Sequence, residues 1–120
     1  MKNFNDILLL IDTLLGENGC AWDKKQTIFS LKNYILEEAQ EVSEAVDLKD
    51  KKKIKEEIGD LLYTSLFLAK VGSIDIDEIT DSLHKKMVRR HPHIFGNENC
   101  KDIEDIEKMW KRIKKEEKAP

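Results

Sequence analysis

The feature that most constrains the fold is the stretch from Tyr34 to Thr64, YILEEAQEVSEAVDLKDKKKIKEEIGDLLYT. Its apolar residues recur at intervals of three and four, which is the period of an amphipathic helix. The charged segment LKDKKK, residues 48–53, divides the stretch into two helices. Because a link this short brings successive helices back alongside each other, we expect an antiparallel helical hairpin.

Acidic residues occupy the apolar faces of both predicted helices. Glu38 lies in the middle of a stripe spaced by three and four, formed by Leu31, Ile35, Val42 and Ala45. Glu57 takes a similar place on the second helix, beside Ile54 and Leu61. Solvated helix faces account for other acidic residues such as Glu44 and Glu56, but not for a carboxylate in an apolar seam. Such a carboxylate costs free energy unless a positive charge meets it.

Residues three apart share a helix face, so Glu38 pairs with Glu41 and Glu57 pairs with Asp60. Across an antiparallel hairpin the two pairs can face each other, and without a cation their carboxylates would raise one another's pKa values. No Cys or His stands at matching spacing, so the ligands are all oxygen atoms, which favours Mg²⁺ or, as a substitute, Mn²⁺. Magnesium bound in this way keeps positions for water and substrate phosphates.

The rest of the chain also has helical periodicity, and we expect an all-α protein with one domain over residues 1–120. Helices are predicted over about 5–15, 28–47, 51–71, 75–90 and 102–117, with a loop over 16–26. Thr27 is the expected N-cap of the second helix, Gly72 ends the third, and Pro92 breaks the fourth.

Composition excludes several classes of function. The formal net charge is −3, so bulk charge gives no reason to expect nucleic-acid binding. The apolar run Ile7–Ile11 is too short to cross a bilayer and lacks a signal-peptide layout. Cys20 and Cys100 form no C-x-x-C motif, and we expect reduced thiols in a cytoplasmic protein without a membrane partner.

Four stretches, in order along the chain, resemble the MazG-type nucleoside triphosphate pyrophosphohydrolases. They are GCAWDKKQT at 19–27, LEEAQEV at 36–42, EEIGDLLY at 56–63 and KMVRRHPHIFG at 86–96. The resemblance covers nearly the whole chain, and its paired motif Glu-Glu-x-x-Glu and Glu-x-x-Asp is the metal-binding signature of that family. Ala21 departs from the Pro that relatives carry before Trp-Asp, and Tyr34 stands where some relatives have a phosphate-binding Lys.

The resemblance implies a role for each matching residue. The implied Mg²⁺ ligands are Glu38, Glu41, Glu57 and Asp60. The implied substrate-binding residues are Lys53, Lys86 and Arg90 at the phosphates, Trp22 at the base, and Trp110 at the closure of the pocket. Glu37 would position water or touch a second ion, and either Glu37 or Glu41 would take the proton of the attacking water.

The implied reaction converts a nucleoside triphosphate and water into the monophosphate and pyrophosphate. Two alternatives stay open: a relative specialised for one substrate, such as dUTP or phosphoribosyl-ATP, and a helical interaction module without catalysis. The predicted third helix carries apolar residues on more than one side: Leu61, Leu62, Leu66, Phe67 and Leu68. We therefore expect a homodimer whose paired hairpins form a four-helix bundle, with a tetramer of two such dimers also open.

Overall fold

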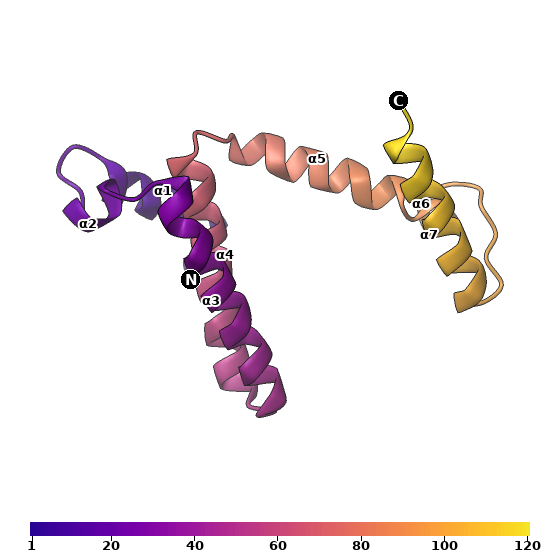
Figure 1. The fold of residues 1–120 in the computed structure, drawn as a ribbon, viewed down its shortest axis with the longest axis horizontal. Coiled ribbons are helices and arrows are strands. Elements are labelled where there is room, and N and C mark those ends of the chain that lie inside the picture. Colours follow the sequence, from indigo (N-terminus) through magenta and orange to yellow (C-terminus); the bar gives the residue numbers. More distant parts are fainter. The chain divides into compact units, whose positions relative to one another are not determined.

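The computed structural model describes residues 1–120 and consists of helices joined by loops (Figure 1). The helices are α1 (Phe4–Leu15), α2 (Ala21–Lys24), α3 (Ile28–Asp47), α4 (Lys51–Val71), α5 (Ile76–Arg89), α6 (Pro92–Phe95) and α7 (Ile103–Lys118). The predicted all-α class is confirmed, and no helix is both long and apolar enough to cross a membrane. The chain forms two compact units, Met1–Ile76 and Asp77–Pro120. A single domain over 1–120 stays a prediction.

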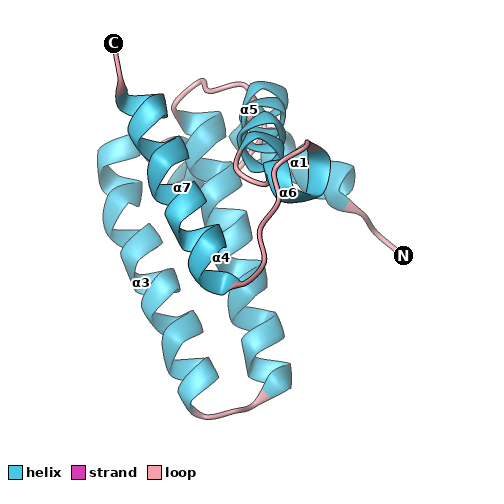
Figure 2. Ribbon diagram, turned by 90° about the vertical axis from the view of Figure 1, so that its right-hand side faces the viewer, coloured by secondary structure: helices cyan, strands magenta, loops and turns pink.

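In the first unit, α3 and α4 run antiparallel and form the predicted hairpin (Figure 2). Thr27 caps α3 by accepting a hydrogen bond from the Ser30 backbone N–H at 3.1 Å. Asp50 caps α4 by accepting bonds from the backbone N–H groups of Lys52 and Lys53 at 3.1 and 3.2 Å. Lys49 makes the turn between them with a φ of 57°, in the left-handed region. The short turn and the Asp50 cap fix how α4 begins alongside α3.

The core of the first unit lies where α1 packs on the hairpin. It consists of the buried side chains of Ile11, Leu31, Leu66, Phe67, Ala69 and Ile76. A salt bridge of 2.8 Å between Lys70 and Asp12 joins α4 to α1. Leu66 and Phe67, two of the residues expected to need a partner, are therefore covered within the chain itself.

The other half of the hairpin has no third helix of this unit over it. Its exposed large apolar side chains are Leu36, Val46, Leu48, Ile58 and Leu62. Burying an apolar side chain contributes about 25 cal/mol per Å². A surface of this kind therefore leaves stabilisation unused in a single copy of the chain.

The segment predicted as a loop over 16–26 contains the one-turn helix α2. The Cys20 N–H donates to the Leu14 carbonyl at 2.8 Å, and the Lys24 N–H donates to the Cys20 carbonyl at 2.9 Å. Gly19 lies so close to α1 that a Cβ there would come within 2.0 Å of the Leu14 carbonyl oxygen. Only glycine fits this approach, which ties α2 to the end of α1.

The second unit is built on α5 and α7. The Trp110 indole N–H donates to the backbone carbonyl of Arg90 at 2.8 Å, and Arg89 and Arg90 both donate to the Glu117 carboxylate. Asp102 caps α7 by accepting a hydrogen bond from the Asp105 N–H at 2.9 Å. Pro92 is the first residue of α6, so the predicted break after α5 is confirmed.

Candidate active site

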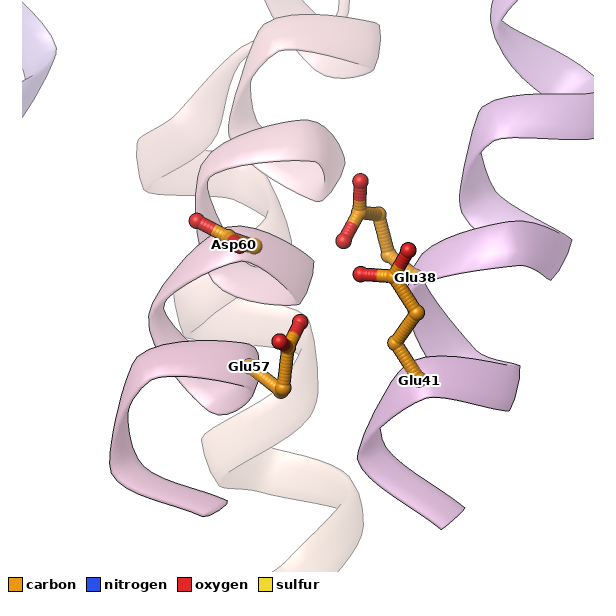
Figure 3. A group of neighbouring side chains, drawn as sticks. All are labelled: Glu38, Glu41, Glu57 and Asp60. Carbon is orange, nitrogen blue, oxygen red and sulfur yellow. The ribbon is translucent and has the colours of Figure 1, made fainter. Parts of the chain in front are cut away.

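Four carboxylates from the two helices of the hairpin converge on one space (Figure 3). Glu38 and Glu41 come from α3, and Glu57 and Asp60 come from α4. One oxygen atom of each lies within 4.8 Å of the corresponding atoms of the other three. The predicted convergence of these four residues, hereafter the carboxylate quartet, is confirmed.

The quartet has no compensating positive charge within its own unit. None of its members forms an ion pair with a lysine or arginine. Glu57 is 8% exposed and Glu38 is half-buried, and each has one buried carboxylate oxygen without a hydrogen-bond partner. Orphaned buried oxygens of this kind are rare in folded proteins, and they indicate that a ligand completes the site.

The pKa values of Glu57 and Glu38 are both raised, as expected for carboxylates without a cation. A hydrogen bond that the protonated Glu57 carboxyl donates to Glu41, then burial, then the charges of Glu41 and Asp60 raise the pKa of Glu57 from the ordinary 4.5 to about 7. Burial, followed by the charges of Glu41 and Asp60, raises the pKa of Glu38. The proton that Glu57 keeps reduces the repulsion between the carboxylates, and a bound cation would reduce it as well.

The donor set and its dimensions fit a hard divalent cation. Magnesium takes oxygen ligands at about 2.1 Å, so two ligands on opposite sides of the ion are about 4.2 Å apart. The mutual separation of at most 4.8 Å within the quartet is close to that span. Oxygen-only ligation suits Mg²⁺ or Mn²⁺ better than Zn²⁺.

An aromatic cavity of about 340 Å³ adjoins the quartet. Its walls include the rings of Trp22, Tyr34, Tyr63 and Phe67, and it shares Glu38 and Asp60 with the quartet. Trp22 meets Tyr34 edge to face, with ring centroids 5.9 Å apart. The predicted base-stacking residue Trp22 therefore does lie beside the carboxylates.

Several residues that line this cavity were not predicted from the sequence. They are Asp23, Leu31, Tyr63, Thr64 and Phe67. Part of the signal was available, because Tyr63 and Phe67 follow Asp60 by three and seven residues and so share its helix face. Asp23 gave no such signal, since it comes from the turn that forms α2.

The remaining predicted site residues are not in the cavity. Glu37 is exposed on α3, and Lys53 is exposed on α4, one turn before Glu57. Lys86, Arg90 and Trp110 belong to the second unit, so their participation in the site stays a prediction.

Arg90 and Trp110 have partners of their own in the second unit. The Arg90 guanidinium donates to Glu117 through Nε at 3.2 Å and through Nη2 at 2.9 Å. The Trp110 indole ring also meets His91 edge to face, with centroids 5.9 Å apart. Trp110 therefore has at least a structural role, as its hydrogen bond to the Arg90 carbonyl indicates.

Known proteins share both the sequence and the fold. Residues 26–95 match the family model described as the MazG nucleotide pyrophosphohydrolase domain. The nucleoside triphosphate pyrophosphohydrolase of Escherichia coli K12 is 37% identical over 99% of this chain and 47% of its own length. The nucleoside triphosphate pyrophosphohydrolase/pyrophosphatase MazG of Thermotoga maritima is 38% identical over 97% of this chain and 46% of its own length.

A solved structure agrees with these matches. The crystal structure of a mazG-related protein from Thermotoga maritima superposes with a TM-score of 0.79 and 34% identity, covering 93% of this chain and 99% of that one. The chain spans about a quarter to a half of the length of the curated relatives that it matches.

Proposed function

The chain belongs to the MazG nucleotide pyrophosphohydrolase family, and on this premise we propose that it hydrolyses ribo- or deoxyribonucleoside triphosphates to the monophosphate and pyrophosphate. The observation that carries the proposal is the carboxylate quartet, with its two buried, unpartnered oxygens and no cationic side chain. A protein that bound no metal would be more stable with apolar residues at these positions.

The metal in this proposal is Mg²⁺, with Mn²⁺ as a substitute, held by Glu38, Glu41, Glu57 and Asp60. When bound, a divalent ion neutralises charge on the triphosphate and lowers the pKa of a coordinated water. The fit rests on the oxygen-only ligands and on their separation within 4.8 Å.

The shared lining of the cavity and the quartet supports cleavage at the α-phosphate. Glu38 and Asp60 border both. A nucleoside in the cavity, with its base against Trp22, would have its nearest phosphate at the quartet, and the α-phosphate is that nearest phosphate. Ligand pockets are commonly apolar and aromatic with a few polar groups, and this cavity has that composition.

In the reaction, the oxygen of water bonds to the α-phosphorus as the bond from that phosphorus to the bridging oxygen breaks. Pyrophosphate leaves with the bridging oxygen, and Glu37 or Glu41 accepts the proton of the water. Lys53, Lys86 and Arg90 bind the departing phosphates in this proposal, and Trp110 closes the pocket over them.

We also propose that the protein is a cytoplasmic homodimer in which two hairpins form a four-helix bundle. The exposed apolar side chains of the hairpin, such as Leu36, Ile58 and Leu62, support this proposal. Gly59 lies on α4 between Ile58 and Leu62. It has open space where its Cβ would be, so another backbone can come close there. Light scattering at micromolar concentration should give the mass of two chains; a tetramer would extend the proposal, and a monomer would contradict it.

The test of the activity is a panel of ribo- and deoxyribonucleoside triphosphates and phosphoribosyl-ATP, incubated with Mg²⁺ and followed by pyrophosphate release. We expect release from several nucleotides and none with a chelator. Release from dUTP or phosphoribosyl-ATP alone would indicate the specialised relative. The absence of release from every nucleotide, together with unchanged thermal stability on adding a chelator, would favour an interaction module.

A substitution separates the metal assignment from the activity. Glu38→Gln keeps the size of the side chain and removes its charge, so we expect it to lose most of the Mg²⁺-dependent release. Full activity in this variant would refute the assignment of Glu38 as a ligand, while leaving the hydrolase itself intact.

A further inference from the structure

Asp23 is a half-buried carboxylate in the aromatic cavity that the quartet does not include. It makes neither an ion pair nor a side-chain hydrogen bond within the first unit. The turn that carries it is held in place, because the side-chain amide of Gln26 donates to the Trp22 carbonyl at 2.9 Å and the Cys20 N–H donates to the Leu14 carbonyl at 2.8 Å. The backbone that carries Asp23 is therefore held in place by the fold of the first unit.

Asp23 has no ion-pair partner in the cavity. The cavity is walled by aromatic rings and already contains Glu38 and Asp60. Burial, and after it the nearby Asp23 carboxylate, raises the pKa of Tyr63, so the phenol beside Asp23 stays protonated. Asp23 is not a member of the quartet, and no side chain of the first unit forms an ion pair with it. A ligand in the cavity that donates hydrogen bonds to Asp23 would satisfy its carboxylate oxygens.

We propose that Asp23 is a specificity-determining residue that selects a nucleobase with two adjacent N–H donors, which among the common bases is guanine. The inference rests on the proposed function, because it takes the cavity to be the base site. An ionised carboxylate has two acceptor oxygens and no donor.

Guanine matches this donor requirement better than the other bases. It presents its ring N1–H and its 2-amino group side by side, so each can donate to one carboxylate oxygen. Adenine and cytosine place a ring-nitrogen acceptor beside their amino group, and thymine and uracil flank their single N–H with carbonyl oxygens. A carboxylate repels those acceptors. Hydrogen bonds to a charged acceptor are also stronger than neutral ones.

The test compares dGTP with dITP, which lacks only the 2-amino group, and with dATP, dCTP and dTTP. We expect wild-type kcat/KM to favour dGTP over dITP by about tenfold, the effect of one charge-assisted hydrogen bond at a partly exposed site. Asp23→Asn replaces one acceptor with a donor, so the ratio of its kcat/KM for dGTP to that for dITP should fall to about one. The matched control is Asp47→Asn at the exposed end of α3, outside the cavity, which should keep the wild-type ratio.

The outcomes separate this inference from the proposed function. Turnover with equal kcat/KM for dGTP and dITP would overturn the role of Asp23 and leave the hydrolase intact. If no nucleotide is turned over, calorimetric binding of dGMP and dIMP still decides, because the cavity can bind a nucleoside without catalysis. Equal affinities for the two monophosphates would then overturn the inference, and this comparison needs only the wild-type protein.

Discussion

Glu57 in the α3–α4 hairpin and Glu117 in α7 are both shielded carboxylates, yet their surroundings are opposite. Glu57, 8% exposed, faces Glu41, Glu38 and Asp60, and its pKa is raised to about 7. Glu117 accepts hydrogen bonds from Arg90 and Arg89, which hold its pKa below the ordinary 4.5. Glu57 lacks a cation within its own unit, and Glu117 has two.

The difference shows that Glu117 makes a stabilising contact, whereas Glu57 belongs to an incomplete site. The charge of Glu117 is compensated by Arg89 and Arg90 in its own unit, so these three residues need no ligand. The charges of the quartet are not compensated, and a fold that keeps them gives up stability there. Proteins accept such local costs where a ligand supplies the missing interactions.

The largest effect should come from removing a quartet charge. Glu57→Gln should lower Mg²⁺-dependent pyrophosphate release by at least about 100-fold, since even the loss of an outer partner of a metal ligand costs 10–100-fold. The assay is pyrophosphate release at saturating nucleotide. Glu56→Gln, the same change at the exposed neighbouring position, is the control and should keep its activity. Similar losses in both variants would remove the contrast between quartet and solvated carboxylates.

The second effect concerns how the stability of the metal-free protein depends on pH. The folded chain keeps a proton on Glu57 up to about pH 7, whereas the unfolded chain loses it near 4.5. The folded state therefore binds more protons in that window, and its stability from this group falls as pH rises from about 4.5 to about 7. Thermal unfolding with a chelator from pH 5 to 8 should show this fall, and Glu57→Gln should flatten it.

Adding Mg²⁺ should restore, at pH 8, the stability that the metal-free protein loses when Glu57 ionises. A ligand at 100 times its dissociation constant stabilises the folded state by about 2.7 kcal/mol. The midpoint should rise more at pH 8 than at pH 5, where protons compete for the carboxylates. Equal shifts at both pH values would indicate that the ion binds elsewhere.

A third, smaller effect separates the two tryptophans. Trp110→Phe removes the indole N–H that donates to the Arg90 carbonyl and should lower the free energy of unfolding by about 1 kcal/mol, as measured by urea denaturation. Trp22→Phe is the matched comparison, because Trp22 is 54% exposed and its indole N–H makes no hydrogen bond within the protein. Equal losses in the two variants would show that ring size, and not the hydrogen bond, sets the stability.

The sequence predicted the long helices because their ends carry strong signals. The N-cap Thr27 and the helix-ending Gly72 and Pro92 mark boundaries that the structure confirms. It did not predict α2 and α6, because a helix of four residues is too short to show a period.

The quartet was predictable and the cavity was only partly so. A short turn fixes the register of a hairpin, so spacing alone brings Glu38 opposite Asp60 and Glu41 opposite Glu57 (Figure 3). The cavity depends instead on how the segment before α3 turns back, which no periodicity encodes. Trp22 was therefore placed only through the resemblance, and its neighbour Asp23 was missed. The phosphate contacts of Lys86 and Arg90 likewise rest on the resemblance.

The smallest effect should come from the compensated carboxylate. The pKa of Glu117 is lowered, so its contribution to stability is present above pH 4.5 and is lost as pH falls through the folded-state value. Glu117→Gln should therefore lower the unfolding midpoint at pH 7 and make the fall toward pH 3 shallower. The change should be smaller than that of Trp110→Phe, because solvent screens ion pairs with partly exposed partners such as Arg89.

The control for Glu117 is its neighbour Glu116, which is exposed and lies 3.9 Å from Arg112. Glu116→Gln should leave unchanged the acid limb, which is the fall of the unfolding midpoint between pH 7 and pH 3. An acid limb in Glu117→Gln that matches the wild type would mean that Arg89 and Arg90 do not hold Glu117 ionised. The pH slopes at Glu57 and Glu117 would then no longer be opposite, and the contrast would rest on the quartet alone.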